Sequence, residues 1–328
     1  MSRSIINLAF LGCGAVTGTH SRTLRAFRDK VRCFYASRDQ ARADAFAREW
    51  GGAGSFHSYD AALADDNIDV VLIATPPSTH SALTIAALDQ GKDVIVEKPA
   101  YPRVSDFAAV HAAEQRSGHR VLVAENYCYK PLARVLQSVV ASGTLGEIRF
   151  VHLDAAKRQR QSGWRADPEA ACGGALLEGG VHWIDLLLHL GLHVETVHGF
   201  RPGDWRGIEQ SMLLVVQYEQ GAVGTLTHSW EIPSLLRGLR LSHIYGTRGS
   251  VAFESNGLFA LVTGSRTKLI MPGLRDIGGY RAMFSDFLDV LLTGKEPLMT
   301  LERAQRSVEL VEASYRDAPA THLLETVP

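Results

Sequence analysis

One short stretch of the sequence, LLEGGVHWIDLLLHLG at residues 176–191, places two carboxylates and two imidazoles at helical spacing. Glu178, His182, Asp185 and His189 follow one another at steps of four, three and four residues, which predicts one shared helix face. Four such side chains in a stripe on one face could be metal ligands, an acid–base site or a polar surface of the helix without a chemical role. Because eleven residues of helix extend about 16 Å, one straight helix cannot aim four ligands at one ion. We therefore expect no metal and an acid–base role centred on His182, with His189 stabilised at the helix end.

A second group of residues has the spacing of a phosphate-binding turn. In FLGCGAVTGTH (residues 10–20) an apolar run ends at Gly12, and Gly14 follows directly before a helical pattern. A dinucleotide needs a tight turn at the first glycine and bare backbone at the second, and the helix N-terminus attracts its phosphates. Thr17 stands where a third glycine is usual, which we expect to loosen the helix–strand packing slightly. The expected cofactor contacts of this loop are Gly12, Gly14, Ala15 and Val16.

The end of the next apolar run bears on the choice of cofactor. NAD-binding sites usually carry an acidic residue there, which holds the ribose 2′-hydroxyl. Here the segment reads FYASRDQ, so Ser37 and then Arg38 occupy that place. A hydroxyl and a guanidinium bind a 2′-phosphate well, so we favour NADP(H) over NAD(H). The alternative is that Arg38 is a solvated loop charge and that Asp39 takes the acidic role.

The elements that must position these residues follow two different patterns along the chain. Residues 1–126 alternate short apolar runs with helical segments, which predicts a Rossmann-type, doubly wound parallel sheet that binds a dinucleotide. Residues 127–328 contain alternating strands joined by short turns with glycine, followed by two amphipathic helices. The predicted fold is therefore α/β, with a C-terminal α+β domain that has a large, mainly antiparallel open sheet.

Composition excludes several other classes of protein. The 34 basic and 35 acidic residues nearly cancel, so no global charge draws the chain to nucleic acid or to an anionic membrane. No apolar run reaches the roughly 18 residues that a membrane helix needs. The four cysteines are scattered without zinc-site spacing, which is typical of reduced thiols in a cytoplasmic protein. We expect a small-molecule substrate.

With these residues in place, the chain resembles the Gfo/Idh/MocA family (glucose–fructose oxidoreductase, inositol dehydrogenase, rhizopine catabolism protein) over essentially its whole length. The resemblance rests on the glycine loop and on three further segments. These are ATPPSTH (74–80), GKDVIVEKP (91–99) and GGALLEGGVHWID (173–185). It implies an NAD(P)-dependent oxidoreductase acting on a hydroxyl or carbonyl carbon of a sugar, cyclitol or related molecule. It also implies a homodimer or homotetramer formed through the open sheet of the second domain, which would bind substrate as well.

The resemblance also assigns roles to individual residues. Lys98, in the Glu-Lys-Pro ending of its segment, falls where the family carries its catalytic lysine, and it would share the handling of the proton with His182. Glu178 stands where the family usually has aspartate, so its catalytic role could be substrate contact or tuning of His182. The remaining implied cofactor contacts are Thr75, Pro76, His80 and Glu97. The implied substrate contacts are Tyr127, Trp164, Arg165 and Asp185.

Two other functions stay open on the sequence alone. A redox-neutral enzyme could hold NAD(P) tightly and use transient oxidation to drive an elimination, as some glycosidases of this fold do. A non-catalytic regulatory protein could keep the glycine loop but would have no need for Lys98 and His182 together.

Overall fold

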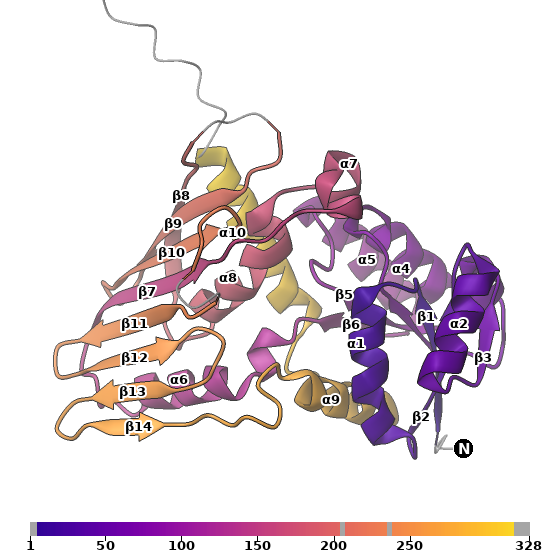
Figure 1. The fold of residues 1–328 in the computed structure, drawn as a ribbon, viewed down its shortest axis with the longest axis horizontal. Helices are drawn as coiled ribbons and strands as arrows, with labels where there is room; N and C mark the ends of the chain where they lie inside the picture. Colours follow the sequence, from indigo (N-terminus) through magenta and orange to yellow (C-terminus); the bar gives the residue numbers. More distant parts are fainter. Residues whose placement is uncertain (1–4, 204–206, 235–237, 318–328) are drawn as a thin grey trace, which may run out of the picture. The chain divides into compact units, whose positions relative to one another are not determined.

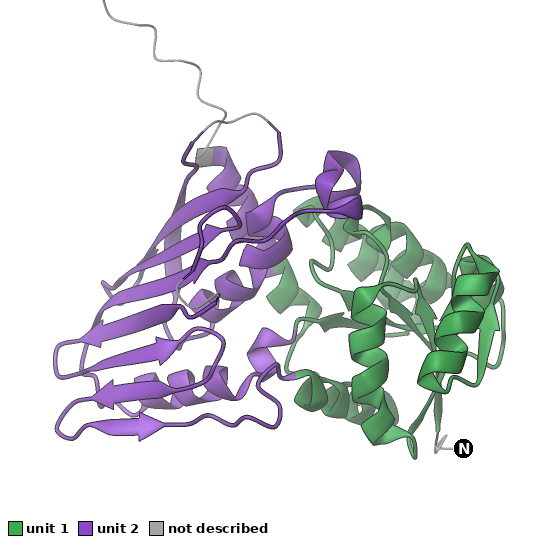
Figure 2. Ribbon diagram, viewed as in Figure 1, with its two compact units in different colours: residues 1–125, 280–305 green, residues 126–279, 306–328 purple. Residues whose placement is uncertain are grey.

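The computed structural model describes residues 5–203, 207–234 and 238–317. The chain divides into two compact units (Figures 1 and 2). Unit 1 comprises residues 1–125 and 280–305, and unit 2 comprises residues 126–279 and 306–328. Each unit has its own sheet and its own core.

Unit 1 is built on a six-stranded parallel sheet of order β3-β2-β1-β4-β5-β6. Four of the strands are completely or almost completely buried, as expected of a parallel sheet with helices on both faces. In Figure 1 α1 lies on the near side of this sheet, and α4 and α5 lie together on the far side. The strands are β1 (Ile6–Leu11), β2 (Val31–Ala36), β3 (Gly54–Phe56), β4 (Val70–Ile73), β5 (Asp93–Glu97) and β6 (Val121–Ala124). The helices that precede unit 2 are α1 (Ala15–Leu24), α2 (Gln40–Trp50), α3 (Tyr59–Leu63), α4 (His80–Asp89) and α5 (Val104–Ser117).

The chain returns to unit 1 after leaving it. Helix α9 (Tyr280–Thr293) packs against α1, where Tyr280 and Phe284 contact the His20 ring edge-on. Arg120 also donates to the main-chain oxygens of Gly294 and Lys295. The sequence pattern assigned residues 127–328 to one second domain, and the structure instead packs 280–305 with the first unit. The sequence of an amphipathic helix shows which of its faces is buried, but it does not show which part of the protein that face packs against.

Unit 2 is built on an eight-stranded sheet of order β14-β13-β12-β11-β7-β10-β9-β8. All its strand pairs are antiparallel except β7 with β10, which confirms a mainly antiparallel sheet. The strands are β7 (Ile148–Ala156), β8 (Val194–Phe200), β9 (Ser211–Tyr218), β10 (Val223–Ser229), β11 (Leu241–Gly246), β12 (Ser250–Glu254), β13 (Ala260–Thr263) and β14 (Lys268–Ile270). The helices are α6 (Pro131–Ala141), α7 (Pro168–Ala171), α8 (Val181–Leu188) and α10 (Leu301–Asp317), which begins in unit 1.

One face of this second sheet is covered and the other is open. Side chains of α6, α8 and α10 join alternate strand residues in one core, which includes Leu136, Ile184 and Leu310. The opposite face, called the open face below, presents large apolar side chains that are between 36% and 61% exposed. These are Phe150, Phe200, Leu213, Leu241, Tyr245, Leu261 and Leu269.

Among the helices of the described residues, none is both long enough and apolar enough to cross a membrane.

Candidate active site

Four neighbouring strands of unit 1 carry predicted site residues to one edge of the sheet. In the order β2-β1-β4-β5, the residues that directly follow the strands are Ser37, Gly12, Ala74 and Lys98. Because all four strands run in parallel, their carboxyl ends share the edge at which open α/β sheets bind their ligands. The structure thus brings the glycine loop, the segment that contains Thr75 and the Glu-Lys-Pro segment together.

The glycine loop has the shape that a pyrophosphate requires. Gly12 adopts φ +108°, and a Cβ there would lie 2.8 Å from the main-chain oxygen of Ala74, so a larger residue does not fit. Gly14 precedes α1 as its N-cap, and no atom of the described residues lies within 4 Å of where its Cβ would stand. Open space above bare backbone at a helix N-terminus fits a dinucleotide phosphate, with the N–H groups of Ala15 and Val16 at the start of the helix.

Thr17 closes this loop rather than loosening it. Its side chain is completely buried, and its hydroxyl donates to the main-chain oxygen of Gly12 at 2.7 Å. The same hydroxyl accepts from the Gly14 N–H at 3.4 Å. The expectation of looser packing was wrong, because a β-hydroxyl in this position ties the two loop glycines to the first turn of α1.

After β2, Asp39 caps the next helix, and Arg38 and Arg42 supply two positive charges. Asp39 caps α2 by accepting from the N–H groups of Ala41 and Arg42, at 3.0 and 3.4 Å. Its N–H donates to the hydroxyl of Ser37, which is 8% exposed. The cap uses only Oδ1 of this exposed aspartate, so the alternative in which Asp39 holds a ribose hydroxyl stays open.

Arg38 precedes α2, and Arg42 lies in its first turn. Burial raises the pKa of Tyr59, and the positive charges of Arg38 and Arg42 oppose that rise. Arg42 likewise acts on Cys13 of the glycine loop, where burial raises the thiol pKa to about 11. Arg42 was missed in the sequence.

Lys98 follows β5 on a backbone that a buried acid–imidazole pair holds in place. The Glu97 carboxyl group contacts Nε2 of His20 on α1, and its second oxygen accepts from the Lys98 N–H at 3.1 Å. Burial acts to raise the pKa of Glu97, but the His20 hydrogen bond and the charges of His20 and Lys98 outweigh it, so the pKa is lowered. The Lys98–Pro99 peptide bond is cis. Glu97 is 8% exposed and positions Lys98 through its main chain.

His80 fastens the Lys98 segment to the segment after β4. The ring is 1% exposed, with Nδ1 at 3.0 Å from the carbonyl oxygens of Pro99 and Ala100 and Nε2 at 2.9 Å from that of Thr75. Burial lowers its pKa, although the carbonyl contacts favour the protonated ring. With both nitrogens engaged by main chain, His80 positions the strand ends. Its expected direct contact with cofactor stays a prediction, as does that of Thr75, whose hydroxyl bonds Thr79 at 2.6 Å.

In unit 2 the stripe that contains Glu178 begins as a π-helix. Residues Leu176–Gly180 form one π-helical turn, and α8 starts at Val181. The simple α-helical spacing expected from Glu178 to His189 therefore fails in its first step, because a π turn contains more residues than an α turn. Glu178 is 9% exposed and accepts a hydrogen bond from Nε of Arg165 at 3.1 Å. The Arg165 guanidinium in turn stacks on Trp164, with Cζ 4.4 Å from the ring centroid.

His182 lies against the predicted substrate residue Tyr127. The two rings stack with centroids 4.2 Å apart and planes 21° from parallel. Trp183 contacts the same tyrosine edge-on, and Nζ of Lys130 stands 4.0 Å from the centre of its ring. Lys130 is 6% exposed, so a buried cation and the half-buried imidazole share one aromatic neighbour.

The tail of the stripe is structural. Asp185 is 1% exposed and lies 3.2 Å from Nδ1 of His189, which also bonds the main-chain oxygen of Asp185 at 2.7 Å. His189 ends α8, as expected for a helix-end histidine. Burial argues against the predicted substrate contact of Asp185. No group of three or more potential metal ligands occurs among the described residues.

The buried carboxyl group of Glu209 stabilises the π turn. Glu209 accepts from the Leu176 N–H at 2.8 Å and from the Tyr315 hydroxyl at 2.7 Å. A side chain at Gly174 would collide with Glu209, which explains the glycine there. Burial raises the pKa values of both Glu209 and Tyr315. Sequence reasoning missed this pair because Glu209 and Tyr315 lie far from the motif along the chain.

The fold and the loop define a class, namely oxidoreductases with an NAD-binding Rossmann domain. A model of that class, described as the NAD-binding Rossmann fold of the GFO_IDH_MocA oxidoreductase family, matches residues 6–125, and the model of the family's C-terminal domain matches residues 133–252. The chain belongs to the Gfo/Idh/MocA family of oxidoreductases.

Proteins similar to this chain include dehydrogenases and other oxidoreductases. D-xylose 1-dehydrogenase (NADP(+)) 2 of Haloferax volcanii is 27% identical over 294 residues, which cover 86% of this chain and 88% of that protein. Trans-1,2-dihydrobenzene-1,2-diol dehydrogenase of Bos taurus is 28% identical over 196 residues, or 59% of this chain and 58% of that one. In fold, the chain is similar to aldose-aldose oxidoreductase from Caulobacter crescentus, with a TM-score of 0.85, 20% identity and coverage of 96% and 97%.

Proposed function

We propose that this NAD(P)-binding oxidoreductase transfers hydride between the nicotinamide and a hydroxyl or carbonyl carbon of a sugar, cyclitol or related small molecule. The observation that carries the proposal is the shared edge of β2, β1, β4 and β5, where the glycine loop and Lys98 follow neighbouring strands. When bound, the nicotinamide supplies or accepts the hydride. The names of the similar dehydrogenases, which include a xylose and a dihydrodiol enzyme, support this substrate class.

In this proposal the chain's own residues handle the proton. The Lys98 ammonium donates to the carbonyl oxygen, or takes the hydroxyl proton in the reverse direction, and it stabilises the developing alkoxide. His182 exchanges that proton near neutral pH. Glu178, held by Arg165, keeps the π turn before His182 in place and offers its second carboxyl oxygen to a substrate hydroxyl. Trp164 and Tyr127 supply apolar faces of the kind that pack on sugar rings.

For the cofactor we favour NADP(H). Arg38 directly follows Ser37 in the chain, and Arg42 adds a second positive charge in the first turn of α2. Phosphate pairs with guanidinium in a bidentate geometry, whereas a carboxylate at this place would repel it. The NADP(+)-dependent xylose enzyme is a relative with the same preference.

For the assembly we infer a homodimer or homotetramer formed through the open face. Seven large apolar side chains lie exposed on this one sheet face, as expected of a surface that contacts another chain. Tyr245→Arg should therefore lower the mass measured by light scattering, and Leu258→Arg, in the β12–β13 turn, should not. An unchanged mass for Tyr245→Arg, or a monomeric wild type, would remove this inference. A cytoplasmic location stays a prediction that rests on four free thiols.

The function is tested by titrating the purified chain with NADPH and NADH and then following nicotinamide absorbance with a panel of aldoses, sugar lactones and cyclitols. We expect cofactor binding and cofactor-dependent turnover of at least one substrate. Absence of binding to both cofactors would overturn the proposal. Product formation without net change in absorbance would favour the redox-neutral alternative instead.

A further inference from the structure

A hollow of about 290 Å³ lies on unit 1 at the opposite end of β2 from the cofactor edge. It is bounded by the end of α1, the first residues of β2 and the end of α2, and its lining includes Arg25, Arg28, Arg32, Tyr35 and Trp50. No residue that we place in the active site lines it. Tyr35 connects it to α1 through a hydrogen bond from its hydroxyl to Ser21, at 2.9 Å.

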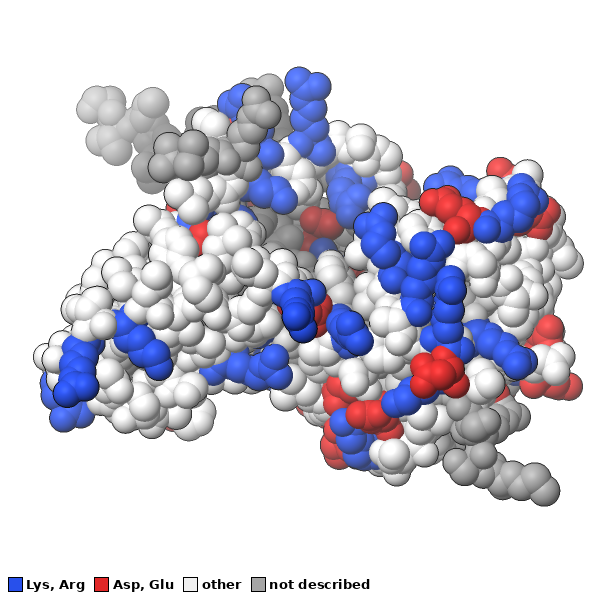
Figure 3. All heavy atoms as spheres, turned by 60° about the horizontal axis from the view of Figure 1, so that its bottom comes forward, with Lys and Arg blue, Asp and Glu red and all other residues white. Residues whose placement is uncertain are grey.

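The arginines around this hollow lack acidic partners. Arg22, Arg25, Arg28 and Arg32 are all exposed, and none forms an ion pair with a carboxylate of the described residues. Arg25 bonds the main-chain oxygen of Glu49, at 3.0 Å, rather than its carboxyl group. Residues 18–33 contain five basic residues and one acidic residue, although the chain as a whole is nearly neutral. Figure 3 shows the basic side chains gathered in runs over the half of the view that unit 1 occupies. Like charges this close repel one another, and a bound anion would offset that cost.

Trp50 and the end of α2 hold the guanidinium groups in place. Arg22 and Arg25 lie over the indole, with Cζ 5.6 and 5.0 Å from the ring centroid. A stacked guanidinium keeps its N–H groups directed outward in its plane. Gly51 ends α2 at φ +69°, and a Cβ there would lie 3.7 Å from Nη2 of Arg28. Packing against Trp50 and the end of α2 therefore orders these arginines around the hollow.

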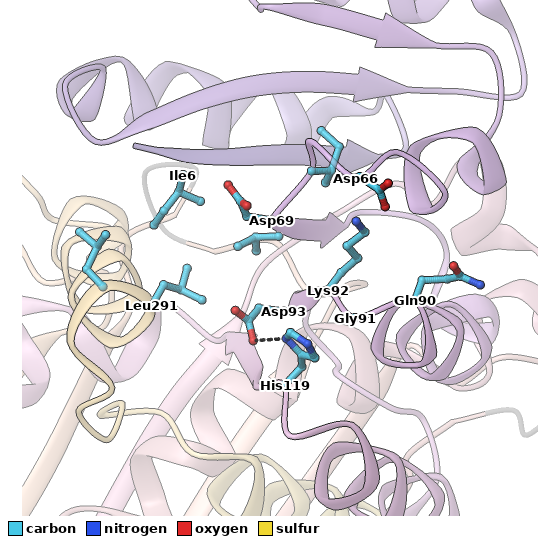
Figure 4. A pocket seen from close by; sticks show the side chains of 12 residues that line it. Ile6, Asp66, Asp69, Gln90, Gly91, Lys92, Asp93, His119 and Leu291 are labelled. Atoms are coloured by element: carbon cyan, nitrogen blue, oxygen red, sulfur yellow. Dashed lines mark ion pairs between the residues drawn. The ribbon is translucent and has the colours of Figure 1, made fainter. Parts of the chain in front are cut away.

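A larger hollow in the same unit is lined differently. It measures about 640 Å³ and lies at the amino ends of β1, β4 and β5, away from the glycine loop (Figure 4). Its lining carries charges of both signs: three carboxylates, Lys92 and His119, with Asp93 paired to His119 at 3.4 Å. Among the described residues, the lining of the arginine hollow carries basic groups and no carboxylate.

We propose that the arginine hollow binds a small phosphorylated molecule, a phosphate monoester with a short organic part. Guanidinium groups match phosphate oxygens in bidentate pairs, and several such groups converge here. The volume is near the lower end of ligand pockets, which suits a phosphate with few attached carbons. Nucleic acid would require a basic stripe along many phosphates, and this cluster is compact.

The test is calorimetric titration of the full chain with inorganic phosphate and with glycerol 3-phosphate, each with saturating NADP⁺ present to fill the cofactor site. We expect both probes to bind, glycerol 3-phosphate more tightly. The double variant Arg25→Gln, Arg32→Gln should weaken binding about ten-fold or more, because two charge-assisted contacts are lost. Arg266→Gln, an exposed arginine between β13 and β14, is the matched control and should change nothing.

Three results would overturn the proposal. One is the absence of heat with either probe at millimolar concentration. Another is equal binding by wild type and the double variant, provided that their thermal unfolding coincides. The third is loss of binding in Arg38→Gln with retention in the double variant, which would place the anion at the cofactor edge.

Discussion

Arg165 and Glu178 form a pair that joins a short 3₁₀ turn to the π turn before His182, with Nε of the arginine 3.1 Å from Oε1 of the glutamate. The side chain of Arg165 is 39% exposed and that of Glu178 is 12% exposed, so the pair links the surface to the buried start of α8. The family resemblance implies aspartate at this position, and the longer side chain of Glu178 reaches Arg165.

Shortening the Glu178 side chain or removing the charge of Arg165 should affect turnover and stability, respectively. Glu178→Asp should withdraw the carboxylate from Arg165 and lower kcat/KM about ten-fold, a loss typical of one displaced polar contact. Arg165→Gln should lower the free energy of unfolding by about 1 kcal/mol, because half of the pair is solvated. Urea unfolding and steady-state kinetics measure the two effects. Arg158→Gln, another exposed arginine of the same segment, serves as the control, and a Glu178→Asp enzyme as active as wild type would contradict the assignment.

The Glu97–His20 pair should make stability depend on acid. Burial opposes ionisation of Glu97, but its hydrogen bond with His20 and the nearby charges lower its pKa below the usual range of a glutamate. A carboxyl group with a lowered folded-state pKa adds stability above its unfolded pKa, and this stability is lost as pH falls through the folded value. Glu97→Gln should therefore lower the free energy of unfolding at pH 7 by about 3 kcal/mol, and its unfolding should change less between about pH 7 and about pH 3. Parallel urea curves at the two pH values check this, and equal acid sensitivity of variant and wild type would refute it.

Thr17 should matter for cofactor affinity more than for overall stability. Thr17→Val keeps the shape but removes the hydroxyl that bonds Gly12 and Gly14, at a cost of about 1 kcal/mol in unfolding free energy. A less restrained loop should raise the dissociation constant of NADPH several-fold, as measured by fluorescence titration. Thr17→Ser should behave like wild type. Equal affinity in all three proteins would show that the hydroxyl does not order the loop.

The basic pair beside Ser37 should set cofactor preference. Arg38→Gln and Arg42→Gln should each weaken NADPH binding by about ten-fold or more, since each removes a charge-assisted contact with the 2′-phosphate. NADH, which lacks that phosphate, should bind both variants as it binds wild type. Titration of each protein with both cofactors gives the ratio directly. A wild type that binds NADH more tightly than NADPH would contradict the preference.

Much of the fold follows from local patterns, whereas several site features depend on distant partners. The alternation of apolar runs and helices predicted the parallel sheet of unit 1, although β3 (Gly54–Phe56) is too short to show a period. The π turn could not be foreseen, since it depends on Glu209 and Tyr315. The return of α9 to unit 1 was missed for the same reason.

The roles of individual side chains were likewise predictable only where they depend on neighbours in the sequence. Asp39 caps α2 through its immediate neighbours, a role of the kind that local sequence can indicate. Thr17 was misjudged because its effect depends on where its hydroxyl points, which the residue type alone does not show. Glu178 could be recognised as unusual, but its partner Arg165 emerged only from the folded chain.

We propose that Lys98, at the carboxyl end of β5, handles the proton of the reaction. The most direct measurement compares turnover and cofactor binding in Lys98→Met, with the exposed Lys268→Met as control. We expect turnover to fall by about 10²- to 10⁴-fold in Lys98→Met, as for loss of a general acid–base group, while the dissociation constant of NADPH stays near the wild-type value. Turnover within a few-fold of wild type in that variant would contradict the account.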